Sequence, residues 1–581
     1  MSKMRQVIEH NKCRRLLISV FVMILCIPLA FAQQKVKVTG RIVDQKTQEP
    51  LIGVSVVERG SSNGIMSDLN GRYQLNVSKG ATLIFTYVGY QTVQKVANTP
   101  IINVVLAEDA KILDEVVVVG YGVQKKSSLT GSVSQVKSED MQARTITTAG
   151  QALQGKTAGV EVLSASARPG SSPTIRIRGI SSNGSSDPLF VVDGRIASDI
   201  GGIDPNDIES MEVLKDASSA AIYGSRAGNG VVLITTKRGK GNGKISYDFQ
   251  LSSQSLNKVT KVMNAEQYID YYVDAGKLTE TGVYKYWDGV TNTDWTKVAF
   301  ENSIMMRHNL TFQSGSDRGS VYTSLTYLDN NGMVVGNSDT YKRLTGMINV
   351  DYNIKPWLEL GSNNQIEYYK VKTVSEGSEY GSLLLSVLQL DPLTKATYTT
   401  NDMPENMKTI LNGGSAYATL LSDGNGNYYG VSPFVTSENL NPLIMRDRSF
   451  TDNRGFNING STFINFKPIK GLVVTSRLGY RLAATESYGY SNDYWANSLA
   501  HQKFMSVNST ASTPSYFQWE NFANYTRTFG KHTVTAMVGT HYSESRSFYV
   551  TGSITGADDD LGVKQDDPLF YYFAYATGSA T

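Results

Sequence analysis

Histidine and carboxylate residues are the groups in this sequence that could bind a metal ion or catalyse a reaction, but their spacing matches few known catalytic motifs. Of the five histidines in the 581-residue chain, His541, in the stretch HYSE, has a glutamate at the spacing of a carboxypeptidase-type zinc site. No histidine follows it to complete the site, and the alternation around it predicts an outward-facing position on a strand. No nucleophile elbow or metalloprotease helix motif is present. The sequence therefore predicts a protein that is not an enzyme and carries no cofactor.

Acidic and glycine-rich stretches are weak candidates for ion-binding sites. Asp68 and Asn70 lack the glutamate that would close an EF-hand loop, so an Asx-type turn explains them better. The stretch Ala557–Asp567 could bind calcium, but a solvated acidic loop is the better interpretation. The spacing of the glycines at 224, 228 and 230 fits neither a dinucleotide fingerprint nor a phosphate loop. With a net charge of +3 and no nucleic-acid-binding motif, we expect no metal site and no nucleic-acid partner.

The N-terminus has the pattern of an export signal. A basic segment precedes the apolar run Leu16–Ala30, and Ala30-Phe31-Ala32 fits a signal-peptidase site. The apolar run is shorter than the roughly 20 residues of a membrane-spanning helix, which disfavours the alternative of an anchor. We expect a signal peptide over residues 1–32. Both cysteines, Cys13 and Cys26, lie within it, so the exported chain would have no thiol.

The next segment predicts a small β-sandwich over residues 35–108. Alternating stretches separated by turns, such as KVTGRIVD and DLNGRYQLNV, are typical of short strands. The stretches GRIVD, PLIGV and DLNGRY make this segment resemble a carboxypeptidase regulatory-like domain. That resemblance implies a folding module without catalysis.

The stretch DEVVVVGYG follows, within a linker at residues 112–126. Four consecutive valines favour an extended chain, and the glycines at 120 and 122 end the run before it could become a long strand. No hairpin partner is evident from the sequence. A strand of the preceding sandwich is the alternative interpretation.

Residues 127–240 combine short strands, glycine turns and one helical patch. An alternating strand precedes the polar loop of RGISSNG, and PLFVVDG predicts a buried strand that ends in an Asp-Gly turn. Asp204-Pro205 predicts a helix start, and Val231–Thr236 a final strand. The segment is therefore expected to be a compact α+β domain.

Residues 241–581 show the alternation of long antiparallel strands. In GMINVDYNI, apolar side chains from Ile348 to Ile354 fall on one face and Asn349, Asp351 and Asn353 on the other. Tight turns such as IKPW alternate with long, polar connections at residues 372–450 and 488–512, the asymmetry of a transmembrane barrel. We predict nine strands, ending near Val550. A soluble sandwich shares the alternation, and the long strands and asymmetric connections are what favour a barrel.

The order of these motifs resembles the SusC/RagA family of TonB-dependent outer-membrane transporters over residues 1 to about 240. The resemblance implies a mainly β protein in the outer membrane: a signal peptide, the sandwich, an α+β plug domain, then the N-terminal part of a large antiparallel barrel. It implies that the valine stretch is a TonB box, comprising Asp114, Glu115, Val116, Val117, Val118, Val119, Gly120, Tyr121 and Gly122. It also implies that the plug motifs include Arg178, Gly179, Asp193, Gly194, Tyr223, Gly224, Arg226, Gly228 and Gly230.

The same resemblance implies a function, with its partners. TonB would energise import of a nutrient captured together with a SusD-like surface lipoprotein, whether the nutrient is an oligosaccharide or a peptide. The alternative is an outer-surface adhesin or scaffold without transport. A family barrel has about 22 strands, and the final DDPLFYYFAYATGSAT does not resemble a terminal barrel strand. We therefore expect this chain to be a C-terminally truncated member or a fragment.

Overall fold

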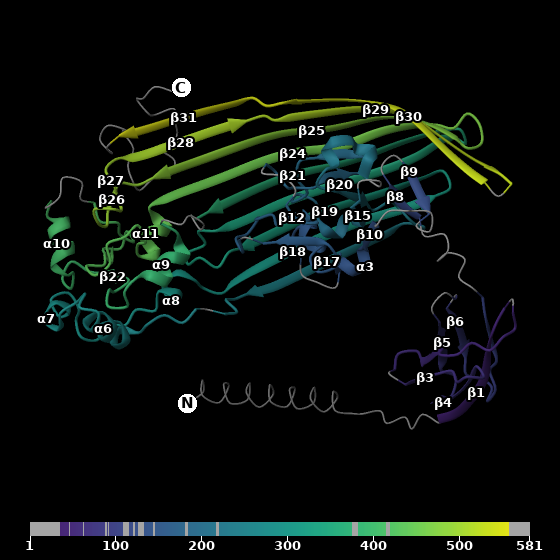
Figure 1. The fold of residues 1–581 in the computed structure, drawn as a ribbon, viewed down its shortest axis with the longest axis horizontal. Coiled ribbons are helices and arrows are strands. Elements are labelled where there is room, and N and C mark those ends of the chain that lie inside the picture. The colour runs from purple at the N-terminus through teal and green to yellow at the C-terminus, as the bar shows by residue number, and fades with distance from the viewer. Residues whose placement is uncertain are drawn as a thin grey trace, which may run out of the picture. The chain divides into compact units, whose positions relative to one another are not determined.

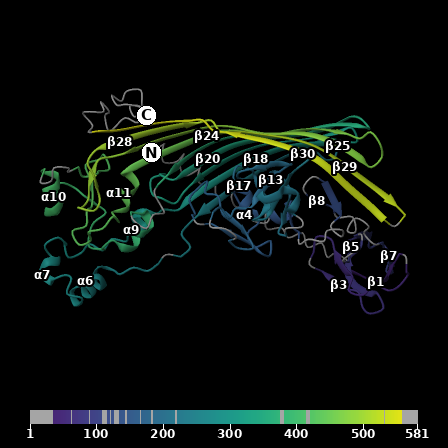
Figure 2. The ribbon, with the colours of Figure 1, turned by 45° about the horizontal axis from the view of Figure 1, so that its top comes forward.

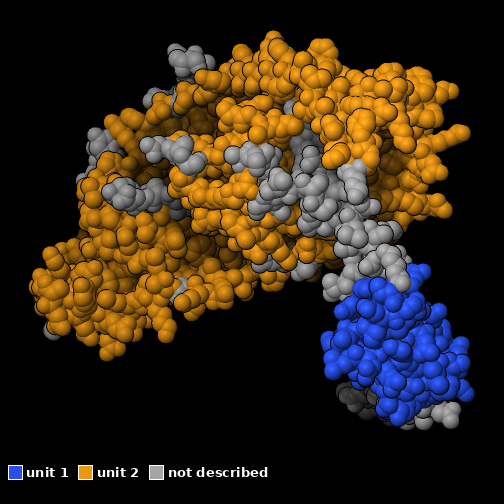
Figure 3. All heavy atoms as spheres, turned by 45° about the vertical axis from the view of Figure 1, so that its right-hand side comes forward, with its two compact units in different colours: residues 1–116, 125–127 blue, residues 117–124, 128–581 orange. Residues whose placement is uncertain are grey.

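The computed structural model describes residues 35–556, except 46, 62, 88–89, 91, 108–115, 120–121, 126–132, 143–145, 165, 181–183, 217–219, 259, 375–380, 414–418 and 531. The chain divides into two compact units, residues 1–116 with 125–127, and residues 117–124 with 128–581 (Figure 3). The mainly β fold class is confirmed. The expected signal peptide, the acidic stretch Ala557–Asp567 and the C-terminal stretch lie outside the described residues.

The first unit is a β-sandwich. One sheet has the order β4-β1-β7, from β1 (Lys35–Asp44), β4 (Arg72–Ser78) and β7 (Val104–Leu106). The other has the order β3-β2-β5-β6, from β2 (Ser55–Glu58), β3 (Gly64–Met66), β5 (Thr82–Thr86) and β6 (Val93–Val96). The Asp68 carboxylate accepts hydrogen bonds from the backbone N–H groups of Asn70 and Arg72 at 2.9 and 2.8 Å, as the expected Asx-type turn requires.

The valine stretch forms β8 (Val116–Val119), which pairs with β9 (Gly122–Lys125) in a sheet of two strands. This pairing could not be predicted from the sequence, because β9 has neither a β-branched run nor alternation. Since β8 joins neither sheet of the sandwich, the alternative interpretation of the valine stretch is wrong. Asp114, Glu115, Gly120 and Tyr121 lie outside the described residues.

Residues 133–240, here called the plug segment, surround a mixed sheet with the order β10-β15-β16-β13-β14. These strands are β10 (Val133–Lys137), β13 (Leu189–Val192), β14 (Arg195–Ala197), β15 (Ile208–Leu214) and β16 (Val231–Thr236). The segment also contains α3 (Ser138–Gln142), α4 (Ala149–Ala152), β11 (Val160–Leu163), β12 (Thr174–Ile177), and the 3-10 helices η2 (Pro205–Asp207) and η3 (Ala221–Ala227). The predicted start at Asp204 is confirmed, since its side chain caps η2 by accepting from the Asn206 N–H at 2.9 Å.

In the part of the chain that the structure describes, eleven antiparallel strands form one large sheet, here called the wall. They are β17 (Lys244–Gln254), β18 (Ser303–Ser316), β19 (Gly319–Asn331), β20 (Thr340–Lys355), β21 (Leu358–Thr373), β24 (Ser449–Phe466), β25 (Leu472–Ser491), β28 (Met505–Ser512), β29 (Ser515–Phe529), β30 (His532–Arg546) and β31 (Tyr549–Gly556). Both β28 and β29 pair with β25, and a break at Thr513-Pro514 separates them. Their neighbours β31 and β30 are likewise separated near Phe548. The eleven strands therefore make nine passes, the number predicted.

The two faces of the wall have opposite polarity. On β20, Ile348 is 49% exposed on the outer face, whereas the adjacent Asn349 is 1% exposed on the inner face. The same contrast holds on β21 between Ile366 and its neighbours Gln365 and Glu367. A soluble sandwich would bury its apolar face, so this sheet has the polarity of a barrel wall with lipid outside.

The connections are tight at one end of the wall and long at the other (Figures 1 and 2). Among their described residues, the long ones carry the helices α6 (Ala265–Asp274), α7 (Glu280–Val283), α8 (Trp295–Ala299), α9 (Leu383–Gln389), α10 (Glu405–Leu411) and α11 (Pro442–Asp447). They also carry the short pairs β22 (Thr397–Tyr398) with β23 (Tyr428–Tyr429), and β26 (Tyr494–Trp495) with β27 (His501–Gln502). In the part of the chain that is described, no helix has the length and hydrophobicity needed to cross a membrane.

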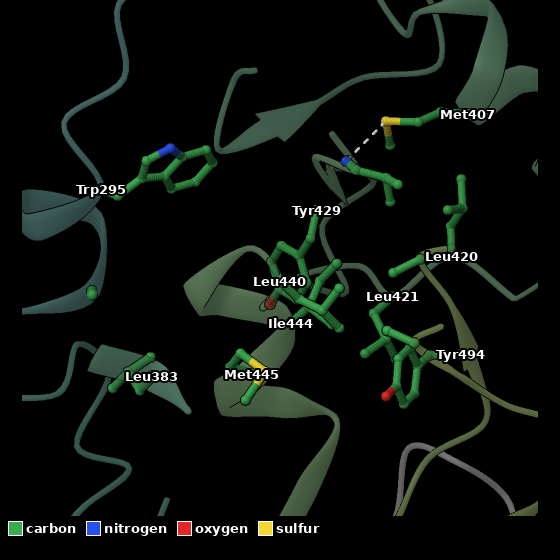
Figure 4. Close-up of a cluster of buried hydrophobic side chains, with 14 of the residues drawn as sticks. Trp295, Leu383, Met407, Leu420, Leu421, Tyr429, Leu440, Ile444, Met445 and Tyr494 are labelled. Atoms are coloured by element: carbon green, nitrogen blue, oxygen red, sulfur yellow. Dashed lines mark hydrogen bonds between the residues drawn. The ribbon is translucent and has the colours of Figure 1, made fainter. Parts of the chain in front are cut away.

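The long connections were expected to be polar, and this expectation is wrong. Four of them share one apolar cluster, here called the loop core (Figure 4). Trp295 comes from the β17–β18 connection, Val334 from β19–β20, Met407 from β21–β24 and Tyr494 from β25–β28. The Trp295 indole N–H donates to the Asp391 carbonyl oxygen at 2.7 Å and so joins two connections. The composition of each segment did not indicate this shared core, because its apolar residues are spread over four segments far apart in the sequence.

Trp295→Ala should loosen the loop core, because Trp295 is 2% exposed and its removal leaves a large cavity. We expect a cost of about 3–5 kcal/mol in the stability of the loops. Limited proteolysis of the protein in outer membranes measures this as faster cleavage between residues 374 and 448. Trp295→Phe, which keeps most of the apolar volume, is the matched control. Equal cleavage rates for Trp295→Ala and the parent would contradict the proposed importance of the core.

Candidate functional site

The plug segment lies against the inner face of the wall (Figures 1 and 2), and polar contacts join the two. Wall side chains repeatedly donate to plug carbonyl oxygens. Arg343 donates to Gly201 at 2.7 Å, Gln365 to Gly202 at 2.7 Å and Asn349 to Lys237 at 2.8 Å. Each contact gives a partner to a donor on a side chain that is almost completely buried. The interface between plug segment and wall is therefore the candidate functional site.

The predicted Asp193-Gly194 turn lies at this interface. Both residues have positive φ, 48° and 82°, in the turn between β13 and β14. The Asp193 carboxylate accepts from the backbone N–H and the hydroxyl of Thr236 at 3.1 and 2.6 Å, which ties the turn to β16. From the wall, Gln518 donates to the Gly194 carbonyl oxygen at 2.9 Å and accepts from the Ile196 N–H at 3.0 Å. One buried amide thus holds both sides of the turn.

A second contact surrounds η2 of the plug segment. Asp204 is completely buried and lies 3.8 Å from the Arg343 guanidinium and 3.9 Å from that of Arg307, both on the wall. Asp207 is also completely buried, and the wall residue Tyr322 donates its hydroxyl to it at 2.9 Å. Burial, and to a lesser degree the neighbouring Asp204, raises the pKa of Asp207 to about 7. At neutral pH this carboxyl group is therefore close to its midpoint.

The predicted motif from Tyr223 to Gly230 makes a third contact. Tyr223 is buried, and burial, followed by the Glu520 carboxylate, raises the pKa of its hydroxyl. Arg226 lies 3.5 Å from the Nε2 of His541, whose Nδ1 is 3.1 Å from the wall residue Glu520. Gly224 and Gly230 both have positive φ, and Gly228 caps η3.

The predicted outward position of His541 is wrong. It pairs directly across the sheet with Glu520, which is buried on the inner face, and side chains directly opposite share a face. Glu544, the glutamate of the HYSE stretch, forms an ion pair with Arg546 at 2.6 Å. In the described parts of the chain, no group of three or more histidine, cysteine and acidic residues could hold a metal ion.

Arg178 and Gly179, also predicted as plug motif residues, make a different contact. Arg178 pairs with Asp216 of the plug segment at 2.5 Å, and its side chain is half exposed. Both residues have positive φ, 59° and 91°. This pair stabilises the plug segment internally.

Sequence reasoning missed the wall side of the interface. Gln518, Arg343, Gln365 and Asn349 lie at alternating positions of strands, so their face could be inferred. Their partners are backbone carbonyls of the plug segment between 112 and 324 residues away in the chain. No local pattern encodes such pairs.

Comparisons with known proteins agree with this arrangement. The chain matches the TonB-dependent Receptor Plug Domain over residues 125–231 and the CarboxypepD_reg-like domain over residues 38–118. It is 32% identical to TonB-dependent receptor P39 of Formosa agariphila, over 88% of this chain and 46% of that protein. It is 37% identical to TonB-dependent receptor SusC of Bacteroides thetaiotaomicron, over 64% of this chain and 37% of that protein. The chain thus spans half or less of the length of these curated relatives.

Among solved structures, the RagAB peptide importer in its open-open state is similar to this chain with a TM-score of 0.61 and 26% identity. The match covers 76% of this chain and 50% of the RagAB chain.

Gly194→Ala should weaken docking of the plug segment. A Cβ at this position would clash with the Arg477 guanidinium, in addition to the cost of about 1–2 kcal/mol for a side chain at positive φ. Gly179→Ala is the matched control, because Gly179 also has positive φ but has open space around its Cβ position. We expect the plug segment to be cleaved several-fold faster by protease in Gly194→Ala than in Gly179→Ala. Equal cleavage would show that Arg477 moves aside without cost.

Plug docking should depend on pH through Asp207. Its pKa is raised above the ordinary value of 3.8 to about 7, so the folded state binds the proton more tightly than the unfolded state. Protonated Asp207 therefore stabilises the folded plug segment. This stabilisation is complete below about pH 4 and is lost as pH rises through about 7. Protease resistance of the plug segment should therefore fall between pH 5 and pH 8. Asp207→Asn should flatten this dependence, and an unchanged pH profile in that variant would contradict the assignment.

Proposed function

Because the chain belongs to the SusC/RagA family of TonB-dependent outer-membrane receptors, we propose that the protein takes part in active import of a nutrient across the outer membrane. The energy would come from TonB and its inner-membrane complex. The observation that carries the proposal is the polar docking of the plug segment on the inner face of the wall.

Polar docking suits a plug that must move. The contacts to Gly201, Gly202 and Lys237 are hydrogen bonds from side chains to carbonyl oxygens, each of net value about 0.5–1.5 kcal/mol. Water can replace such partners when the plug segment shifts, whereas an apolar interface would have to expose apolar surface. A pulling force can therefore exchange these contacts one after another.

We propose that this force enters through the TonB box, Asp114–Gly122. An extended strand with unpaired backbone groups on one edge can be extended by a strand of a partner protein. β8 has one such edge, since β9 is its only partner in the described part of the chain. The partner strand would come from TonB.

Capture of the nutrient would take place at the long connections, together with a SusD-like lipoprotein. The loop core supports this proposal, because it gives four connections one common packing and hence a defined surface. The RagAB structures are of a peptide importer. For this protein, both an oligosaccharide and a peptide remain candidate nutrients.

Val118→Pro tests the role of the TonB box. Proline removes a backbone donor from β8, so we expect TonB-dependent uptake to fall at least tenfold with nutrient binding at the cell surface unchanged. Val118→Thr keeps the N–H group and the β-branched shape and is the matched control. Uptake can be followed with fluorescein-labelled maltohexaose and a fluorescein-labelled casein digest, in cells with and without TonB.

Two results would count against the proposal. Loss of Val118→Pro from the outer membrane would mean that the strand is needed for folding. Surface binding by the parent protein without any TonB-dependent uptake would favour an adhesin instead.

A further inference from the structure

Three basic side chains, here called the basic row, lie next to one another on the outer face of the wall. Lys342 of β20 pairs directly with Lys370 of β21, which in turn pairs directly with Arg454 of β24. Asp329 of β19 and Glu486 of β25 bound the row on its two sides. Each cation lies an even number of residues from the exposed apolar side chains of its own strand, so it shares their face. Like charges directly opposite one another destabilise a sheet, so the row needs compensation.

The carboxylates that pair with the basic row are less exposed than its cations. Asp329 forms an ion pair with Lys342 at 3.0 Å. Asp452 is shared, since it lies 2.8 Å from Lys370 and 3.3 Å from Arg454. The side chains of these two carboxylates are 16% and 7% exposed, whereas those of the three cations are between 36% and 50% exposed. The surface that the row presents is therefore mainly cationic.

An aromatic and apolar row lies directly beside the basic row, one step closer to the tight turns. It consists of Tyr327, Leu344, Tyr368 and Phe456, which pair across four strands and are between 40% and 48% exposed. The Tyr327 hydroxyl donates to Asp329 at 3.3 Å, so its polar end is turned toward the charges. Aromatic residues with one polar end are typical of the boundary between a membrane and water.

The apolar band that begins with this aromatic row has the thickness of a membrane. On β21 it runs from Tyr368 to Leu358, next to the tight turn that follows β20. At about 3.4 Å per residue and a tilt of about 35–45°, this distance corresponds to about 25 Å of membrane thickness. The basic row lies just beyond the band, on the side of the long connections, which face outward in such barrels. It is therefore at the level of the outer-leaflet head groups.

We propose that Lys342, Lys370 and Arg454 bind the phosphate groups of an outer-leaflet lipid, whose acyl chains lie along the apolar band. A phosphate group accepts hydrogen bonds from several directions and carries negative charge, so one group can bridge neighbouring cations that otherwise repel each other. A free anion would use the cations but not the aromatic row beside them. The inference rests on the outer-membrane location of the wall and is independent of the proposed import.

Lipid A and dephosphorylated lipid A are suitable probes, because they differ in their phosphate groups. The full chain, extracted from outer membranes in detergent, is mixed with equal amounts of the two lipids. Native mass spectrometry then measures which lipid remains bound. We expect the parent protein to retain lipid A with at least a fivefold preference over the dephosphorylated form.

Removing the centre of the basic row should abolish this preference. Lys370→Gln with Arg454→Gln and Asp452→Asn removes two cations together with the carboxylate that they share, so no buried charge is left without its partner. We expect this triple variant to bind the two lipids equally. Arg318→Gln with Lys355→Gln is the matched control, because it removes one exposed arginine and one exposed lysine near the tight turns. This control should keep the parental preference.

Lys342→Gln is a second test that leaves Asp452 and its partners unchanged. Its amide can still donate to Asp329, so we expect parental thermal stability and a preference at least twofold lower. An unchanged preference in this variant and in a triple variant of parental stability would overturn the proposal. If the triple variant unfolds at a lower temperature than the parent, Lys342→Gln decides alone.

Two results with the parent protein would also overturn the proposal. Equal retention of lipid A and its dephosphorylated form would show that the row does not recognise phosphate. Displacement of lipid A by an excess of inorganic phosphate would show that the row binds a free anion and that the apolar band contributes nothing.

Discussion

Burial of polar side chains on the inner face of the wall is the constraint on which the rest of this structure depends. A face that carries Gln518, Asn349 and Glu367 can be covered only by a surface that offers hydrogen-bond partners. The turns of the plug segment offer them, because turn carbonyls point outward and have no partner in a sheet. Wall and plug segment thus satisfy each other, and the apolar face of the wall is left for lipid.

Two kinds of contact share the interface, and they differ in how they respond to motion. The amide contacts of Asn349, Gln365 and Gln518 to carbonyl oxygens are interchangeable with water. The buried ion pairs of Asp204 with Arg307 and Arg343 cannot be exchanged for water in this way, because removing one partner would leave a charge buried without compensation. The plug segment is therefore held most firmly around η2 and more loosely at its polar turns.

The sequence predicted the strands and helices of this fold better than it predicted which of them pair or pack together. Alternation around Ile348 and Ile366 identified the wall strands and their faces, and Asp204-Pro205 identified the start of η2, because both signals are local. The pairing of β8 with β9 could not be foreseen, because nothing in the four residues of β9 is specific to a strand. His541 was assigned to the wrong face because its register is set by Glu520 on the neighbouring strand. The loop helices left local signals that could have been found, among them the capping box at Asn264 and Gln267 of α6 and the Asn441-Pro442 start of α11.

The shared loop core has a consequence for how such proteins diverge. Trp295, Met407 and Tyr494 belong to segments separated by long strands, yet each packs in the same cluster. Recombination that exchanged one of these segments between relatives would place its apolar side chains against partners to which their packing is not adapted. New ligand preferences must therefore arise through compensating substitutions in several segments, or through inheritance of all four together. The four connections that share the loop core are therefore expected to vary together, although they are far apart in the sequence.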